Sequence, residues 1–228
     1  MCANVVFSKK EKKKKNFILM NGLTEFSDIE RNSFRTDKVG LYSITASEIA
    51  KDITMSLAEY FNTFSSISIT DATASVGGNS LSFLMHPLFN PINMVELDPV
   101  RVNYLKHNIS IIEKKIPHKT FTVYSQSFID IMMTLEEDVI FIDPPWGGPD
   151  YYKYDTVDLF LSNKIPLVDT CNKLFTKSRL KMIVLKVPKN FDIKTFRDSL
   201  HKTIEISKFR NLENLRKMEI LFLKKKII

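Results

Sequence analysis

The sequence VIFIDPPWGGPD, residues 139–150, joins a run of four apolar residues to a turn that contains three prolines. The apolar run Val139–Ile142 predicts a buried strand that ends at Asp143. Each proline fixes its own φ and restricts the residue before it, so we expect the backbone to leave the strand in one rigid shape. Such a turn can hold carbonyl oxygens and the flat ring of Trp146 at set distances from a planar base.

Strand and helix signals alternate on both sides of this stretch. Strands are predicted at 66–71, 91–96, 120–124, 138–142 and 180–187. Helices are predicted to begin within 80–85 and to cover 99–112 and 165–175. Two later runs, 203–209 and 218–223, predict a closing antiparallel hairpin at one edge. This alternation predicts an α/β fold, a seven-stranded and mostly parallel Rossmann-like sheet with helices on both faces.

Length and composition limit the class of protein. A chain of 228 residues is long enough for one complete core, and no apolar run approaches the roughly 20 residues that span a bilayer. No secretion signal is recognised, and Cys2, Cys171 and four scattered histidines form no zinc pattern. We therefore expect an intracellular protein of the nucleus or cytoplasm, or of an infected host's cytoplasm if the source is a virus. No metal and no membrane are expected, and a monomer is the default.

Positive charge is concentrated at the two ends of the chain. Residues 1–20 contain six lysines and one acidic residue, and residues 201–228 contain eight basic and three acidic residues. The total is +7, so residues 21–200 carry −3. Residues 1–20 are expected to be a solvated tail, with polyanion binding or nuclear import as alternatives. We expect a helical extension at 21–64 that contributes to the substrate site, and a core at 65–228.

A loop of small residues follows the first predicted strand. Asp71–Asn79 contains the pair Gly77 and Gly78, and ligands bind outside the carboxyl ends of parallel strands. The spacing is not G-x-G-x-x-G, so a phosphate is not required, and a ligand with an amino-acid tail such as S-adenosylmethionine fits better. Asp71 is then the candidate for holding the methionine ammonium. The alternative is an ordinary strand-to-helix turn.

A second acidic position ends the next predicted strand. Glu96 is placed to accept both hydroxyls of a ribose, and Asp98 is the competing candidate. Asp98 precedes Pro99 at the start of a predicted helix, so the alternative for it is a helix cap. The two strand-ending acids and the paired glycines together predict a nucleoside-type cofactor.

Four motifs resemble those of trimethylguanosine synthases, which methylate N2 of the 7-methylguanosine RNA cap. They are Asp71–Asn79, Glu96–Pro99, Asp143–Asp150 and Val187–Asn190. Upstream, Gly40–Ala50 looks like the stretch before the family's pre-core helix, and the resemblance covers about 25–223. It implies a class I methyltransferase fold, S-adenosylmethionine as cofactor with S-adenosylhomocysteine as product, and capped RNA or a cap nucleotide as substrate.

The resemblance assigns catalytic and stacking roles. Trp146 would stack on the methylated guanine, whose positive charge adds a cation–π attraction. Asp143, which is also assigned to the cofactor site, would accept a hydrogen bond from the N2 amine together with the Pro144 carbonyl. Phe26 best matches the second stacking aromatic, with Phe34 as the alternative. The alternative for Trp146 and for either phenylalanine is a core contact.

The resemblance also marks further cofactor and substrate positions. Thr45 matches a threonine that touches the cofactor, although it can equally be a helix N-cap with Glu48 as its capping-box partner. Ser127 occupies the adenine-contact position where an acid is usual. The remaining candidates are Asn79 for the cofactor, Asn190 for the substrate, and Arg31, Arg35, Lys38 and Lys189 for the cap phosphates, each of which can equally be a solvated surface charge.

Two other functions remain open. The Asp143–Trp146 motif also occurs in N6-adenine methyltransferases, which hold an adenine amine in the same way. A cap-binding subunit with a decayed cofactor site is suggested only by Ser127, and the intact Asp71, Gly77 and Glu96 argue against it. For the cap enzyme we expect direct in-line transfer and dependence on the 7-methyl group. Whether one or two methyl groups are transferred is not determined by the sequence.

Overall fold

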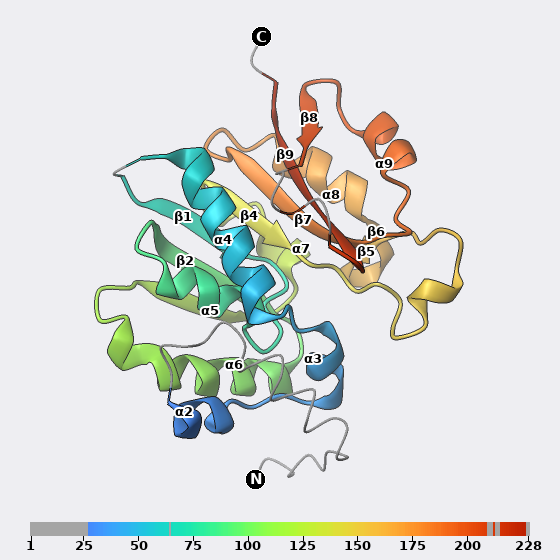
Figure 1. Ribbon diagram of the computed structural model, residues 1–228. Coiled ribbons are helices and arrows are strands. Elements are labelled where there is room, and N and C mark those ends of the chain that lie inside the picture. Colours follow the sequence, from blue (N-terminus) through green and yellow to red (C-terminus); the bar gives the residue numbers. More distant parts are fainter. Residues whose placement is uncertain (1–26, 64, 209–211, 213–214, 227–228) are drawn as a thin grey trace.

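The computed structural model describes residues 27–63, 65–208, 212 and 215–226 (Figure 1). The predictions for the tail 1–20 and for Phe26 lie outside these residues. The main element is a seven-stranded sheet in the order β3-β2-β1-β4-β7-β9-β8. Its strands are β1 (Ile67–Asp71), β2 (Phe89–Glu96), β3 (Phe121–Ser125), β4 (Val139–Ile142), β7 (Met182–Pro188), β8 (Ile204–Ser207) and β9 (Met218–Lys225).

The predicted mostly parallel sheet is confirmed. Strands β3, β2, β1, β4 and β7 pair in parallel, and β9 is antiparallel to both β7 and β8. The last two strands pair as the hairpin prediction required, but β9 lies between β7 and the edge strand β8. Burial explains this order, because β9 has five consecutive buried residues, whereas only Ile204 of β8 is buried.

Alternate residues of the central strand β4 face opposite sides of the sheet, as the period of a strand requires. Val139 and Phe141 pack in one core cluster, and Ile140 and Ile142 pack in another. The first cluster lies under α4, α5 and α6, and the second lies under α7, α8 and α9 (Figure 1). These helices are α4 (Ser47–Phe61), α5 (Gly78–Met85), α6 (Pro99–Ile112), α7 (Phe128–Ile131), α8 (Leu167–Leu174) and α9 (Ile193–Ser199).

The predicted start of α6 agrees with the structure, and a cap and a proline mark it. The Asp98 side chain accepts from the Val100 N–H at 2.8 Å, and Pro99 is the first residue of α6. The helix predicted from residue 165 begins at Leu167, because β6 (Ile165–Pro166) pairs with β5 (Phe160–Leu161). Helices α7 and α9 were not predicted; four and seven residues long, they are too short to show a helical repeat.

Within the described residues before the sheet there are three helices, α2 (Asp28–Ser33), α3 (Lys38–Ser43) and α4. Asn108 of α6 fixes the path between α2 and α3. Its side chain accepts from the Arg35 N–H at 2.7 Å and donates to the carbonyls of Arg35 and Val76 at 2.9 and 2.8 Å. The same amide therefore binds the N-terminal segment and the loop after β1, so the two are held against each other.

The structure of this N-terminal segment rules out two of the alternatives that the sequence left open. Phe34 is 1% exposed and belongs to the core cluster under α4, so its ring has no free face for a ligand. The N-cap of α4 is Ala46, and no side chain caps this helix, so the capping box of Thr45 with Glu48 is wrong. The Thr45 hydroxyl instead accepts a hydrogen bond from Asn79, in the first turn of α5.

Candidate active site

The carboxyl ends of four parallel strands bring the predicted motifs to one edge of the sheet. Asp71 and Glu96 are the last residues of β1 and β2, Asp143 directly follows β4, and Val187–Asn190 spans the end of β7. The loop after β1 is hydrogen-bonded to β2 and to the turn after β4. The Ala74 N–H donates to the Val95 carbonyl at 2.8 Å. The Asp143 N–H donates to the Thr73 hydroxyl at 2.8 Å.

Asp71 is a buried carboxyl group at this edge, with only 1% of its surface exposed. It accepts hydrogen bonds from the Ser80 hydroxyl at 2.6 Å and from the Thr73 N–H at 3.2 Å. Burial, with a smaller contribution from repulsion by Asp143 and Glu96, outweighs those hydrogen bonds and raises the pKa of Asp71 to about 7. An ammonium group bound beside Asp71 would stabilise its ionised form.

The paired glycines have a packing role. Gly77 has a φ of +104°, and a Cβ there would lie 3.0 Å from Leu105 Cδ1 of α6. A Cβ on Gly78 would lie 2.8 Å from Ile44 Cγ1 and 3.2 Å from the Thr45 nitrogen. The loop after β1 thus packs against both α6 and the segment before α4. Close approach of a ligand is therefore not needed to explain these two glycines.

Several buried polar atoms around this loop have no partner in the described part of the chain. Asn79 Nδ2 donates to the Thr45 hydroxyl at 2.9 Å, but Asn79 Oδ1 accepts no hydrogen bond. The hydroxyls of Ser75 and Ser127 are also buried without partners. Buried polar atoms without a partner are rare in folded proteins. Their position after β1 and β3 fits a polar ligand that crosses the ends of these strands.

Glu96 and Asp98 have different environments. Glu96 accepts from the Ser75 N–H through Oε2 and from the Asp98 N–H through Oε1, both at 2.8 Å. Asp98 caps α6, which was the alternative to a role in ribose binding. Its side chain is 37% exposed, against 10% for Glu96. Each carboxylate oxygen can accept a further hydrogen bond. This leaves Glu96 as the better-fixed acceptor for a pair of hydroxyls.

Asp143 forms a buried ion pair that the sequence analysis missed. Its Oδ2 lies 2.6 Å from Lys186 Nζ, and the two side chains are 15% and 3% exposed. Burial raises the pKa of Asp143, while the Lys186 ammonium and the Trp146 indole act in the opposite direction. Lys186 lies within the strand predicted at 180–187. A lysine between the apolar residues 182–185 and Val187 was the available signal, because a buried charge needs a partner.

Trp146 is half-buried on the turn after β4. Its Nε1 donates to the Lys186 carbonyl at 3.4 Å, and Lys186 Nζ lies 5.2 Å from its ring centroid. The Tyr151 ring meets it edge-on, with centroids 5.0 Å apart and planes at 78°. Gly147 and Gly148 follow in the left-handed region, with φ of 87° and 93°. The indole thus packs partly on the core and keeps an exposed part at the ligand edge.

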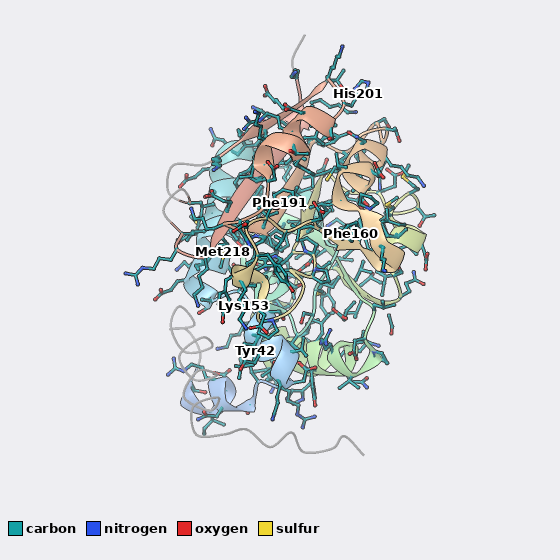
Figure 2. The ribbon with its side chains drawn as sticks, turned by 90° about the vertical axis from the view of Figure 1, so that its right-hand side faces the viewer. Tyr42, Lys153, Phe160, Phe191, His201 and Met218 are labelled. Atoms are coloured by element: carbon teal, nitrogen blue, oxygen red, sulfur yellow. The ribbon has the colours of Figure 1, made fainter. Side chains whose placement is uncertain are left out.

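The other predicted substrate residues have partners within the fold. Lys189 Nζ pairs with Glu219 at 2.6 Å. Asn190 donates to the carbonyls of Tyr151 and Tyr154 at 2.9 and 2.8 Å, and so fixes the loop that carries the tyrosine beside Trp146. The Arg35 and Lys38 side chains are exposed and Arg31 is half-buried, so their binding of cap phosphates stays a prediction. In Figure 2, Lys153 of that loop and Tyr42 of α3 both lie on the side that faces the viewer.

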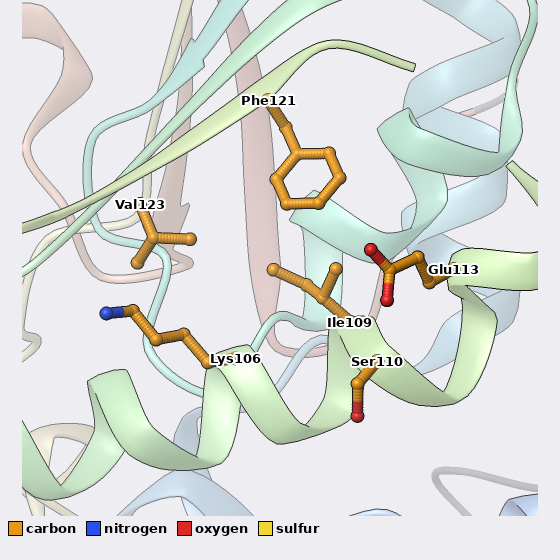
Figure 3. Close-up of a pocket in the computed structure, with 6 residues that line it drawn as sticks. All are labelled: Lys106, Ile109, Ser110, Glu113, Phe121 and Val123. Carbon is orange, nitrogen blue, oxygen red and sulfur yellow. The ribbon is translucent and has the colours of Figure 1, made fainter. Parts of the chain in front are cut away.

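A shallow pocket elsewhere on the surface is separate from these residues (Figure 3). It lies between α6 and β3 and is lined by Lys106, Ile109, Ser110, Glu113, Phe121 and Val123. Among the described residues there is no cluster of His, Cys, Asp and Glu side chains that could hold a metal ion. In the same part of the chain, no helix has the length and apolar character needed to cross a membrane.

Solved structures and sequence relatives agree on the class of protein. A human methyltransferase 10 domain-containing protein superposes with a TM-score of 0.60 at 11% identity, covering 94% of this chain and 97% of that one. At this identity the likeness shows the fold alone. The strand order with its one reversed strand, and the acidic strand ends, are those of the Rossmann-like fold of class I methyltransferases.

The family follows from the sequence comparison. The model of the RNA cap guanine-N2 methyltransferase family matches residues 66–224, so the chain belongs to this family. An uncharacterised protein of Acanthamoeba polyphaga mimivirus is 34% identical over 160 residues, which are 69% of this chain and 58% of that protein. The trimethylguanosine synthase of Schizosaccharomyces pombe is 30% identical over 115 residues, 48% of this chain and 45% of the yeast protein. The chain thus spans about half the length of these curated relatives.

Proposed function

We propose that the protein transfers a methyl group from S-adenosylmethionine to the exocyclic N2 of 7-methylguanosine in RNA caps. The product is 2,7-dimethylguanosine, and a second transfer would give 2,2,7-trimethylguanosine. The observation that carries this proposal is Trp146, held half-exposed on the same turn as Asp143 and Pro144 at the end of β4. A stacking ring beside a hydrogen-bond acceptor is the arrangement that a planar base with an exocyclic amine requires.

The residues around the loop after β1 fit the cofactor. Asp71 would bind the methionine ammonium, and Glu96 would bind the ribose hydroxyls. Asn79 and Ser127, whose buried oxygen atoms have no partner within the described residues, would bind other polar atoms of the cofactor, with Thr45 behind Asn79. When bound, S-adenosylmethionine supplies an electrophilic methyl group.

Asp143 and Pro144 orient the substrate amine. The Asp143 carboxylate and the Pro144 carbonyl accept the two amine hydrogens, so that the nitrogen lone pair points at the methyl group. An exocyclic guanine amine is a poor nucleophile because its lone pair is delocalised into the ring. Fixed alignment of the reacting atoms, about 3–3.5 Å apart, then supplies most of the acceleration. The raised pKa of Asp143 also makes it a better proton acceptor than an aspartate in water.

The 7-methyl group contributes to both binding and chemistry. It places a delocalised positive charge on the base, which strengthens stacking on an indole by a cation–π attraction of roughly 1–2 kcal/mol. The same charge acidifies the amine, so its proton is lost more easily in the transition state. Unmethylated guanine would be a poor substrate for both reasons.

Cofactor affinity is expected to increase with pH through the titration of Asp71. Its pKa in the folded protein is raised to about 7, against about 4 in an unfolded chain, so the native state holds the extra proton between these values. Without ligand, this acid therefore lowers stability as the pH rises from about 4 to 7. Binding of the ammonium requires the carboxylate, so S-adenosylhomocysteine should bind more tightly at pH 8 than at pH 6, with proton release at pH 6.

Calorimetry in buffers of different ionisation enthalpy measures both the affinity and the proton release. Asp71→Asn is the control: its affinity should be lower and should not change over this pH range. Equal affinity of the native protein at pH 6 and pH 8, without proton release, would contradict the placement of the ammonium beside Asp71.

The proposed reaction is tested by the position of the transferred methyl group. The protein is incubated with labelled S-adenosylmethionine and a short RNA that carries a 7-methylguanosine cap, and the RNA is then digested to nucleosides. Label in 2,7-dimethyl- or 2,2,7-trimethylguanosine supports the proposal. Label in N6-methyladenosine would replace it with the adenine reaction. Absence of cofactor binding would favour a subunit without activity.

A further inference from the structure

Lys186 is the charged residue of the site that neither the motifs nor the family comparison assigns. It is the only charged residue in β7, whose seven residues are all buried. Met182 and Val184 face the core under α4 and α5, and Lys186 is the next residue in this row. It therefore lies where the row leaves the core and reaches the ligand edge of the sheet.

Stability gives no reason for a lysine at this position. An apolar side chain of similar volume would bury the same area without the desolvation of two charges. The ion pair is also incompletely shielded, because the Asp143 side chain is 15% exposed. A functional explanation is therefore needed for a lysine that is 97% buried beside the acid of the motif.

The contacts of Lys186 join three parts of the site. Its ammonium lies 2.6 Å from Asp143 Oδ2 and 5.2 Å from the centroid of the Trp146 ring. It also donates to the Ser43 carbonyl at 3.4 Å, at the end of α3, where helix carbonyls lack partners within the helix. Its own carbonyl accepts the Trp146 N–H. The amine acceptor, the stacking ring and the end of α3 are thus all in contact with one residue.

On the basis of the proposed function, we propose that Lys186 is a positioning residue for methyl transfer. Its ammonium binds one oxygen of Asp143, keeps this carboxyl ionised inside the protein, and turns the other oxygen towards the substrate amine. Lys186 does not touch the reacting atoms, so it acts through Asp143. Its removal should therefore lower kcat more than it raises KM, because Trp146 remains in place for stacking.

The charges that face Asp143 decide how it titrates. Lys186 of β7 stabilises its ionised form, as does the Trp146 indole on the turn after β4, and the buried carboxyl of Asp71 at the end of β1 opposes it. Without the ammonium, the effect of burial on Asp143 is no longer opposed by a positive charge. The carboxyl would then hold its proton to higher pH, where a protonated acid cannot accept the amine hydrogen in the same way.

A mutant cycle with a fluorescence readout tests the proposal. Trp146 is the only tryptophan of the chain, so intrinsic tryptophan fluorescence reports on this site alone. Lys186→Met, Lys186→Arg, Asp143→Asn and the double variant Asp143→Asn/Lys186→Met are titrated from pH 5.5 to 9.5 without substrate. In parallel, kcat and KM for 7-methyl-GTP are measured over the same pH range.

The expected result has three parts. Lys186→Met gains a titration step at higher pH than the native protein, and its kcat at pH 7 falls at least about 10-fold and recovers towards high pH. Lys186→Arg, which retains the charge, keeps most of the activity. In the Asp143→Asn background, Lys186→Met adds no titration step and little further loss of kcat, because the residue through which it acts is already neutral.

Opposite outcomes overturn the inference. A loss of kcat that is independent of pH, or an equal loss with and without Asp143, would make Lys186 a structural residue. If Lys186→Met does not fold, Asp143→Asn and the double variant, which has no unpaired buried charge, still decide the question: a large difference in kcat between them contradicts the proposal. A titration step in Lys186→Met together with a native protein inactive on 7-methyl-GTP would refute the proposed substrate and leave the ion pair's role in place.

Discussion

Replacing Trp146 by alanine is expected to lower kcat/KM for 7-methyl-GTP by roughly 100-fold, the combined effect of about 3 kcal/mol from base stacking and cation–π attraction. The loss should appear mainly in KM, since stacking is present before and during transfer. Binding of S-adenosylhomocysteine should change little, because the cofactor candidates other than Asp143 and Thr45 lie at or after the carboxyl ends of β1, β2 and β3. Steady-state kinetics and calorimetry measure the two quantities.

Trp146→Phe is the matched control. Phenylalanine loses the hydrogen bond to the Lys186 carbonyl. It retains a flat ring on the same turn, and this variant should therefore keep much more activity than the alanine variant. Full activity of Trp146→Ala on 7-methyl-GTP would remove the stacking role and leave this residue as a core contact. Loss of cofactor binding in the same variant would point to disruption of the fold.

The second large effect concerns stability, at the amino end of β4. Glu137 is fully buried, and Lys177 binds it at 2.5 Å with a side chain that is 6% exposed. The same ammonium donates to the carbonyls of Met132 and Leu135, and Thr70 donates to the other oxygen of Glu137 at 2.8 Å. Lys177→Met leaves a buried carboxylate without its counter-ion. We expect the free energy of unfolding to fall by about 3–5 kcal/mol.

Urea denaturation of Lys177→Met measures this loss, and two further variants interpret it. Lys153→Met removes an ion pair with Asp150 whose side chains are 60% and 61% exposed, and should change stability by less than about 1 kcal/mol. Lys177→Met/Glu137→Gln removes both charges and should recover part of the loss. A single variant as stable as the native protein would show that the buried pair contributes nothing measurable.

The sheet could be predicted from the sequence because its signals are local. Runs such as Val139–Ile142 are apolar over the length of a buried strand, and Asp98-Pro99 marks the start of α6 with a cap and a proline. The place of β9 between β7 and β8 could not be predicted, because strand order depends on contacts between distant segments. The two-residue strand β6 shortened a predicted helix for the same reason.

The candidate site could likewise be predicted only where the signals are local. Asp71, Glu96 and Asp143 could be placed at one edge, because the carboxyl ends of parallel strands meet there. The partners of these acids could not be predicted. Lys186 reaches Asp143 across 43 residues, and Asn79 reaches Thr45 across 34. Sequence spacing carries no information about such pairs. For the same reason, the packing of Gly78 against Ile44 could not be predicted.

The most direct test of the account compares methyl transfer to 7-methyl-GTP and to GTP by the native protein. If Trp146 and Asp143 form a site for a cationic guanine, the labelled methyl group should appear on 7-methyl-GTP, and transfer to GTP should be at least about 100-fold slower. Equal transfer to both nucleotides, or transfer to neither by a protein that binds S-adenosylhomocysteine, would contradict it.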